Sequence, residues 1–175
     1  MAWDQKMPER PVVAVAGATG AVGIEMLTVH ASGGPAMLAA ACEEAQASAS
    51  KPLVLAVTAL TSLSQEDAQN LGVHGSIEQW VEKLAGLAYG AGIRGLVAST
   101  KELPMLRRKF AGDMKLVIPG IRPAGAALQD QSRAATPAAA IRDGADFIVV
   151  GRPILQAPDP AKAADAIVAE IEQAR

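Results

Sequence analysis

Short, largely apolar runs alternate along this chain with longer segments in which apolar residues recur every three or four positions. The strand-like runs fall at residues 24–30, 53–58, 95–99, 116–118 and 147–150. A strand that is apolar throughout, rather than at every second position, is typical of a parallel sheet covered by helices. Five strand–helix units of this kind therefore predict an α/β fold built on a parallel sheet.

The segments between these runs carry the start signals of helices. Pro35 stands at the first turn of an expected helix that ends near Ala47. Ser76 and Gln79 have the spacing of a capping box. The residues between 59 and 75 are interpreted as a polar loop. Further helices are expected after the later strands, with these residues facing inward: Leu103, Leu106 and Phe110, then Ala164, Ile167, Val168 and Ile171.

Composition limits the class of protein. The chain has 175 residues, which predicts one domain, and 50% of them are hydrophobic while only 3% are aromatic. The net charge of −2, with both signs mixed along the chain, gives no reason to expect a nucleic-acid partner. No apolar run approaches the ~18 residues of a membrane span, and no secretory signal pattern is visible. We therefore expect a cytoplasmic protein that does not bind membranes.

Two architectures agree with five parallel units. A closed eight-unit barrel usually needs about 250 residues and rarely fewer than about 200, so this chain is short by about three units. The fold is then either an open, doubly wound sheet or a (β/α) TIM-type barrel that is truncated or incomplete at its N-terminus. A partial barrel has two unpaired edges, which favour aggregation unless a partner covers them.

Three short pieces in the last third of the chain indicate a phosphate site. They cover residues 117–122, 130–137 and 148–154. In barrels the phosphate is usually bound at the carboxyl ends of the last two strands. Gly151 ends the last strand and lets backbone amides approach an anion, and the guanidinium of Arg152 can bind phosphate with two parallel hydrogen bonds. Arg122 leaves the previous strand after a Pro-Gly turn, and Gln131 comes from the loop between them.

The remaining reactive side chains have structural interpretations. Cys42 is the only cysteine, which excludes an intrachain disulfide and a multi-cysteine metal site, and its apolar neighbours predict a buried, inert thiol. His30 ends a strand and His74 lies in a polar stretch. No cluster of His, Asp and Glu has the spacing of metal ligands, so we expect no metal ion.

Residues 24–175 resemble the C-terminal two-thirds of the orotidine 5′-phosphate decarboxylase family. Members of that family are dimeric barrels that convert OMP to UMP, in pyrimidine biosynthesis, without a cofactor. The motifs that carry the resemblance are Val29-His30-Ala31-Ser32-Gly33-Gly34, Val57-Thr58-Ala59-Leu60-Thr61-Ser62, Pro119-Gly120-Ile121-Arg122, Asp130-Gln131 with Arg133 and Thr136-Pro137, and Val149-Val150-Gly151-Arg152.

The resemblance implies a barrel with a particular set of nucleotide contacts. Thr61, Arg122, Gln131, Gly151 and Arg152 would contact OMP or UMP, and the loop that holds Gln131 would close over the phosphate. It also implies a homodimer. Residues 1–23 would be a divergent N-terminal segment, and residues 24–175 a partial barrel whose C-terminal half binds phosphate.

The family also implies a catalytic array of alternating Asp and Lys, which this chain matches only in part. Asp4, Lys6 and Glu9 fit the family's Asp-x-Lys-x-x-Asp motif with Glu in the last position. Lys6 would then protonate the C6 carbanion, with Asp4 beside it. However, Gln5 and Pro8 are poor strand residues, and the other members of the array are absent. Whether the chain is itself an enzyme is therefore left open.

Two other functions remain as alternatives. The first is a non-catalytic phosphate- or nucleotide-binding module that keeps the binding residues alone. The second is an NAD(P)-dependent oxidoreductase, because Val12–Ala16 followed by Gly17–Gly23 resembles the nucleotide-binding start of aspartate-semialdehyde dehydrogenases. The motif at Val29–Gly34 interrupts the helix that this second interpretation requires.

Overall fold

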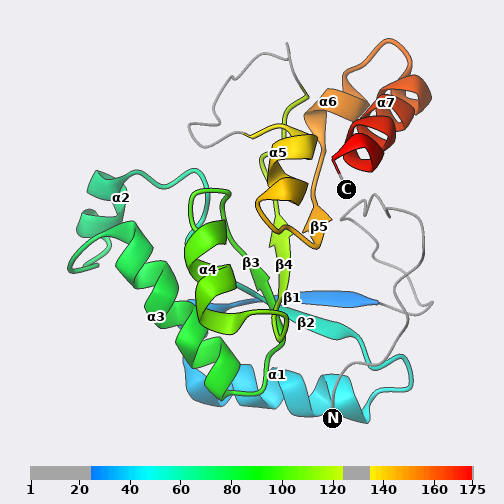
Figure 1. Cartoon of the computed structure of the whole chain (residues 1–175). Helices are drawn as coiled ribbons and strands as arrows, with labels where there is room; N and C mark the ends of the chain where they lie inside the picture. Colours follow the sequence, from blue (N-terminus) through cyan, green and yellow to red (C-terminus); the bar gives the residue numbers. More distant parts are fainter. Residues whose placement is uncertain (1–24, 124–134, 175) are drawn as a thin grey trace.

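A computed structural model describes residues 25–123 and 135–174 of the chain (Figure 1). Its centre is a single parallel sheet of five strands in the order β1-β2-β3-β4-β5. The order along the sheet is thus the order along the chain. The strands are β1 (Met26–His30), β2 (Leu53–Val57), β3 (Gly95–Val97), β4 (Lys115–Ile118) and β5 (Phe147–Ile148).

Helices connect each strand to the next and confirm the expected units. The capping box predicted at Ser76 is present, because its hydroxyl accepts the N–H of Gln79 and its own N–H donates to the Gln79 side chain. Pro35, Pro137 and Pro160 all stand in the first turn of a helix. The helices are η1 (Ala31–Gly33), α1 (Pro35–Ala47), α2 (Gln65–Asn70), α3 (Ile77–Gly90), α4 (Leu103–Phe110), α5 (Pro137–Arg142), α6 (Arg152–Leu155) and α7 (Pro160–Gln173).

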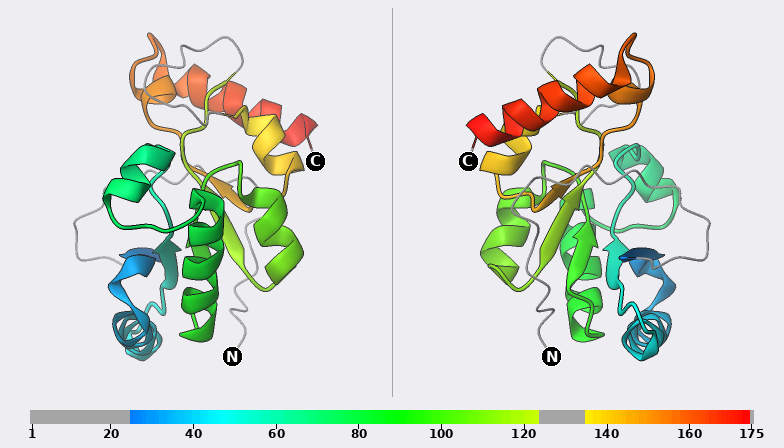
Figure 2. Two further views of the ribbon diagram at one scale, coloured as in Figure 1. Left: turned by 90° about the vertical axis from the view of Figure 1, so that its left-hand side faces the viewer. Right: turned by 90° about the vertical axis from the view of Figure 1, so that its right-hand side faces the viewer.

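The two faces of the sheet differ in what covers them. The larger hydrophobic cluster joins one face of the strands to α1, α3, α4, α5 and α7, and α1, α3 and α4 lie side by side along the sheet (Figure 2). The second cluster contains no helix side chain: Leu53, Leu55, Val117 and Phe147 form it, with Met26, Val97 and Val149, the residue after β5, packed against them. A doubly wound sheet reverses its strand order and carries helices on both faces. Sequential order with helices on one face is the wall of a (β/α) barrel, as predicted.

Both outer strands of this wall are edges within the described residues. Neither β1 nor β5 has a second strand partner there. The side chains of β1 are half-buried or exposed, Leu27 being 39% exposed, whereas four of the five residues of β2 are buried. The other edge strand, β5, is buried at both of its residues, so the exposure of β1 belongs to that edge alone.

Two local predictions differ from the structure. The stretch interpreted as a polar loop contains α2, whose capping box pairs Ser64 with Asp67; the Ser64 hydroxyl and N–H donate to the carboxylate and lower the pKa of Asp67. The spacing Ser-x-x-Asp was visible in the sequence. In α7, Ile167 is buried as expected, but Ala164 and Val168 are only half-buried, because the helix lies at the end of the sheet.

No helix in the described ranges is long and apolar enough to cross a membrane.

One arginine ties the amino ends of the last two strands to α4. Arg107 donates from Nε to the carbonyl oxygen of Gly144 at 2.7 Å and from Nη1 to that of Met114 at 2.8 Å. Its guanidinium also pairs with the carboxylate of Asp146, which in turn accepts the N–H of Leu116 at 2.8 Å. A fixed, five-donor guanidinium suits this arrangement of acceptors, and a lysine could not replace it.

We expect Arg107→Ala to lower the free energy of unfolding by about 2–4 kcal/mol, because it leaves several part-buried acceptors without a donor. Lys109 lies on the same helix and pairs with Glu82 through side chains that are 40% and 45% exposed. Lys109→Ala is therefore the matched control and should change stability by less than about 1 kcal/mol. Urea denaturation measures both, and equal effects would contradict the role given to Arg107.

Candidate nucleotide site

The carboxyl ends of the five strands meet at one rim of the sheet. The segments that follow the strands there are residues 31–34, 58–64, 98–102, 119–123 and 149–151. In (β/α) barrels the active site is built from these segments, since parallel strands deliver all of their carboxyl ends to the same side. Thr61, Arg122, Gly151 and Arg152 all lie on this rim or at the first residue beyond it.

The segment after β4 buries an arginine. Gly120 has a φ of 77°, in the left-handed region that favours glycine, and so turns the chain sharply after Pro119. Ile121 then enters the core, and Arg122 is only 7% exposed. Within the described residues, its guanidinium donates one hydrogen bond, to the carbonyl oxygen of Ile121 at 3.1 Å. A buried cation with so few acceptors in the described fold is one that an anion would stabilise.

The segment after β5 brings a second arginine to the neighbouring position. Val150 is buried, Gly151 is exposed, and Arg152 begins the short helix α6. A Cβ at Gly151 would meet nothing within 4 Å, so the space beside this backbone is open. Because β4 and β5 are paired, Arg122 and the Gly151–Arg152 step leave adjacent strands. The structure thus brings three of the predicted binding residues to one part of the rim.

The other predicted residues are not part of this group. Thr61 is half-buried in the turn after β2, and β3 and β4 lie between that strand and β5. Gln131, the candidate catalytic residues Asp4, Lys6 and Glu9, and the Gly17–Gly23 turn lie outside the described residues. Their predicted roles therefore remain predictions.

The end of β3 carries a polar pair that the sequence interpretation missed. Ser99 is 2% exposed and Glu102 is 4% exposed. The Ser99 N–H donates to Oε2 of Glu102 at 2.9 Å, and the Ser99 hydroxyl donates to the same oxygen. The spacing Ser-x-x-Glu is that of a capping box, but α4 begins only at Leu103 with Glu102 as its N-cap residue, so the pair does not cap this helix.

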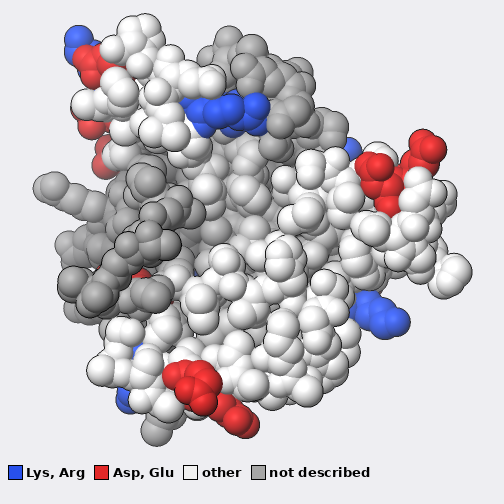
Figure 3. All heavy atoms as spheres, turned by 180° about the vertical axis from the view of Figure 1, so that it is seen from behind, with Lys and Arg blue, Asp and Glu red and all other residues white. Residues whose placement is uncertain are grey.

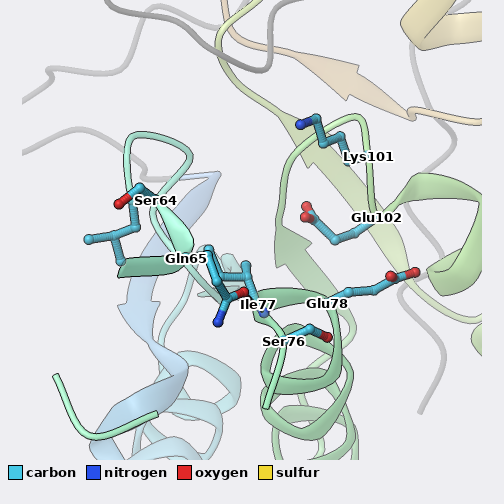
Figure 4. Close-up of a pocket in the computed structure, with 8 residues that line it drawn as sticks. Ser64, Gln65, Ser76, Ile77, Glu78, Lys101 and Glu102 are labelled. Carbon is cyan, nitrogen blue, oxygen red and sulfur yellow. Dashed lines mark hydrogen bonds between the residues drawn. The ribbon is translucent and has the colours of Figure 1, made fainter. Parts of the chain in front are cut away.

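A cavity of about 410 Å³ opens beside this pair. Lys101 and Glu102 point into it from the segment between β3 and α4, opposite Ser64 and Gln65 (Figure 4). Gln65 also fixes the facing loop, because its amide donates to Gly75 at 2.8 Å and accepts from the N–H of Ile77 at 3.0 Å. The lining residues are Leu63, Ser64, Gln65, Ser76, Ile77, Glu78, Lys101 and Glu102.

Charged side chains stand in small separate groups on the face seen from behind, and one basic group lies at the end of the molecule that holds α6 and α7 (Figure 3). His30 and His74 are both exposed. In residues 25–123 and 135–174, no group of three or more His, Cys, Asp or Glu is placed to hold a metal ion.

Comparison with known proteins assigns the chain to a family. Residues 12–167 match the model of the orotidine 5′-phosphate decarboxylase / HUMPS family. The chain belongs to this family. It is 46% identical over 166 residues to orotidine 5′-phosphate decarboxylase of Hahella chejuensis, and 47% identical over 150 residues to that of Idiomarina loihiensis. The resemblance inferred from the five motifs is thereby confirmed.

Solved structures confirm the fold. Orotidine 5′-phosphate decarboxylase from Lactobacillus acidophilus matches with a TM-score of 0.74 at 38% sequence identity, over 85% of this chain. The enzyme from Pyrococcus horikoshii, at 24% identity and a TM-score of 0.60, supports the fold alone.

The chain spans about two-thirds of these relatives. It covers 71% of the Hahella protein, 63% of the Idiomarina protein and 64% of the Lactobacillus chain. Five consecutive strands of a barrel wall agree with that share, since a complete barrel has eight.

The single thiol lies away from the rim, as the sequence predicted. Cys42 is buried in the cluster between α1 and the sheet. Burial raises the pKa of the Cys42 thiol, and the positive charge of Arg94 offsets only part of that rise. Because the thiolate is the reactive form, a raised pKa leaves little of it near neutral pH.

We therefore expect Cys42 to react slowly with iodoacetamide in the folded protein at pH 7 to 8, and to react rapidly once urea unfolds the chain. Mass spectrometry of timed samples measures the modified fraction. Rapid labelling in the absence of urea would contradict the burial of this thiol.

Proposed function

We propose that this chain binds the phosphate group of a pyrimidine nucleotide at the ends of β4 and β5, and that it serves the decarboxylation of OMP to UMP. The observation that carries the proposal is the buried guanidinium of Arg122, with its single acceptor among the described residues, next to Gly151 and Arg152. The names of the relatives support the choice of ligand.

The chemistry of these residues suits a phosphate monoester. A buried cation is costly to the folded state unless it is paired, and a phosphate dianion pairs with a guanidinium through charge-assisted hydrogen bonds. The open backbone at Gly151 allows the anion to approach the amide groups. We propose that Gln131 completes the contacts from the loop before α5, and that Thr61 reaches the distal part of the nucleotide from the end of β2.

The chemical step requires groups that this binding site does not contain. When the bond between C6 and the carboxylate carbon breaks, CO₂ leaves and the electron pair remains on C6, which must then be protonated. We propose Lys6 as the proton donor, with Asp4 beside it and Glu9 in the third acidic position. Binding energy from the distant phosphate can be used to stabilise the transition state at the ring.

The second candidate is a binding module without catalysis, because the sequence matches the family's catalytic array only in part. The oxidoreductase function is not favoured, because the family match runs through residues 12–167 and so includes Gly17–Gly23. We further propose that the chain is a cytoplasmic homodimer, as its family resemblance implies.

The phosphate assignment predicts that Arg152→Ala weakens UMP binding by at least about 1.5 kcal/mol, the scale of a hydrogen bond to a charged group. Arg122→Ala should have a similar effect. Titration calorimetry with UMP measures the affinity. Arg108, an exposed arginine on α4, gives the matched control of equal charge, and Arg108→Ala should leave UMP binding unchanged. If both Arg152→Ala and Arg122→Ala bind UMP as tightly as the unaltered chain, these residues do not bind its phosphate.

The catalytic assignment predicts a different pattern for Lys6→Ala. This variant should lose OMP turnover, followed by the change in ultraviolet absorbance, while it keeps the affinity for UMP, because the phosphate residues are intact. Turnover by Lys6→Ala would remove Lys6 from the mechanism. If the unaltered chain binds UMP and never consumes OMP, the binding-module function replaces the enzymatic one.

A further inference from the structure

The last helix, α7, is hydrogen-bonded to the segment that holds the buried arginine of the rim. We propose that Glu170 of α7 is a positioning residue: it holds the first turn of α5, and through that turn it fixes the backbone of Arg122 and so strengthens the binding of a phosphate group. This inference rests on the proposed function, since it requires that Arg122 bind phosphate. Glu170 itself acts through Arg122 and has no contact with the nucleotide in this proposal.

The packing of α7 brings a carboxylate to the helices that follow β4 and β5. The helix lies against both α5 and α6, which come next in the chain after those two strands. Ile167 and Ile171 are buried in the larger hydrophobic cluster and fix one face of α7 against the rest of the fold. Glu170 follows Ile167 by three positions, so it lies beside this buried face and is half-buried itself.

The first turn of α5 uses Glu170 as a cap. Pro137 has no N–H to donate, and the N–H of Ala139 donates to the Thr136 hydroxyl at 3.2 Å. The N–H of Ala138 donates to Oε1 of Glu170 at 3.1 Å. These first N–H groups have no partner inside their own helix, and a carboxylate suits them because the amino end of a helix carries a partial positive charge. The partner for α5 is therefore supplied by α7.

A backbone hydrogen bond connects the start of α5 to Arg122. Ala135 directly precedes Thr136, the N-cap residue of α5, and its carbonyl oxygen accepts the N–H of Arg122 at 3.0 Å. The guanidinium of Arg122 leaves this fixed backbone and donates to the carbonyl oxygen of Ile121. A shift at the start of α5 consequently moves the backbone of Arg122, and the buried guanidinium moves with it.

The charge of Glu170 gives the positioning role a sign that can be measured. A carboxylate repels phosphate, so a purely electrostatic effect would make Glu170→Ala bind phosphate more tightly. Loss of positioning has the opposite sign, because a binding residue must be held close to its productive geometry. Glu170→Gln separates the charge from the hydrogen bond, since its amide oxygen can accept the N–H of Ala138 without a negative charge.

The test measures the affinities of UMP and inorganic phosphate by titration calorimetry, at a temperature where each variant is folded. We expect Glu170→Ala to bind both about three- to tenfold more weakly, the range of one neutral hydrogen bond, because the contacts of Arg122 are loosened and not removed. Glu170→Gln should restore most of that affinity. Glu172 is exposed on the same helix, and Glu172→Ala is the matched control that should leave both affinities unchanged.

Double variants identify the residue through which Glu170 acts. When Arg122 is already replaced by Ala, Glu170→Ala should cause no further loss of UMP affinity, because no guanidinium remains to be positioned. When Arg152 is replaced instead, Glu170→Ala should still cause its about three- to tenfold loss, since the effects of independent sites add. Equal further losses in the two backgrounds would overturn the action through Arg122.

The remaining outcomes separate positioning from a structural role. A lower melting temperature of Glu170→Ala with unchanged affinities would overturn the inference, and so would tighter binding. If Glu170→Ala does not fold, Glu170→Asp decides, because it keeps the charge but withdraws the carboxylate from Ala138; unchanged affinity in Glu170→Asp would then overturn the inference. Failure of the unaltered chain to bind UMP or phosphate would overturn the proposed function as well, whereas weaker binding by Arg122→Ala alone would overturn this inference only.

Discussion

The parallel, sequential order of the five strands is the constraint on which the rest of the molecule depends. With every strand in the same direction, each connection must cross back along the sheet, and all of the connecting helices lie on one face. The carboxyl ends of the strands consequently share one rim, although the residues that follow them are up to 120 positions apart in the chain (31–151). That rim is where the polar groups of the candidate site gather.

Each end of the sheet carries one arginine that is at least partly enclosed by the fold. At the amino end, Arg107 satisfies backbone carbonyl oxygens and pairs with Asp146, so its charge is used inside the fold. At the carboxyl end, Arg122 is more deeply enclosed but donates to one carbonyl among the described residues. The same type of side chain therefore holds the structure together at one end and, in the proposed function, binds an anion at the other. The difference lies in the acceptors around the guanidinium, not in the residue.

The sequence anticipated much of the fold and part of the site. Continuous apolar strands and the Ser76–Gln79 box located the strands and α3, and Gly151-Arg152 after the last strand pointed to phosphate. The stretch containing α2 was interpreted wrongly, because a six-residue polar helix has too few apolar positions to show a helical period. Ser99 and Glu102 were passed over because nothing in their spacing shows that both side chains are buried, which depends on packing.

The sequence by itself determined the class of the fold, the family and the residues able to bind a phosphate, because strand pattern and motif spacing are local properties. The tertiary structure decided which of those residues meet. It placed Arg122 beside Gly151 and Arg152, set Thr61 three strands from β5, and enclosed the Ser99–Glu102 pair at the rim. Strand order and burial depend on long-range pairing in the sheet, which no short stretch of residues specifies alone.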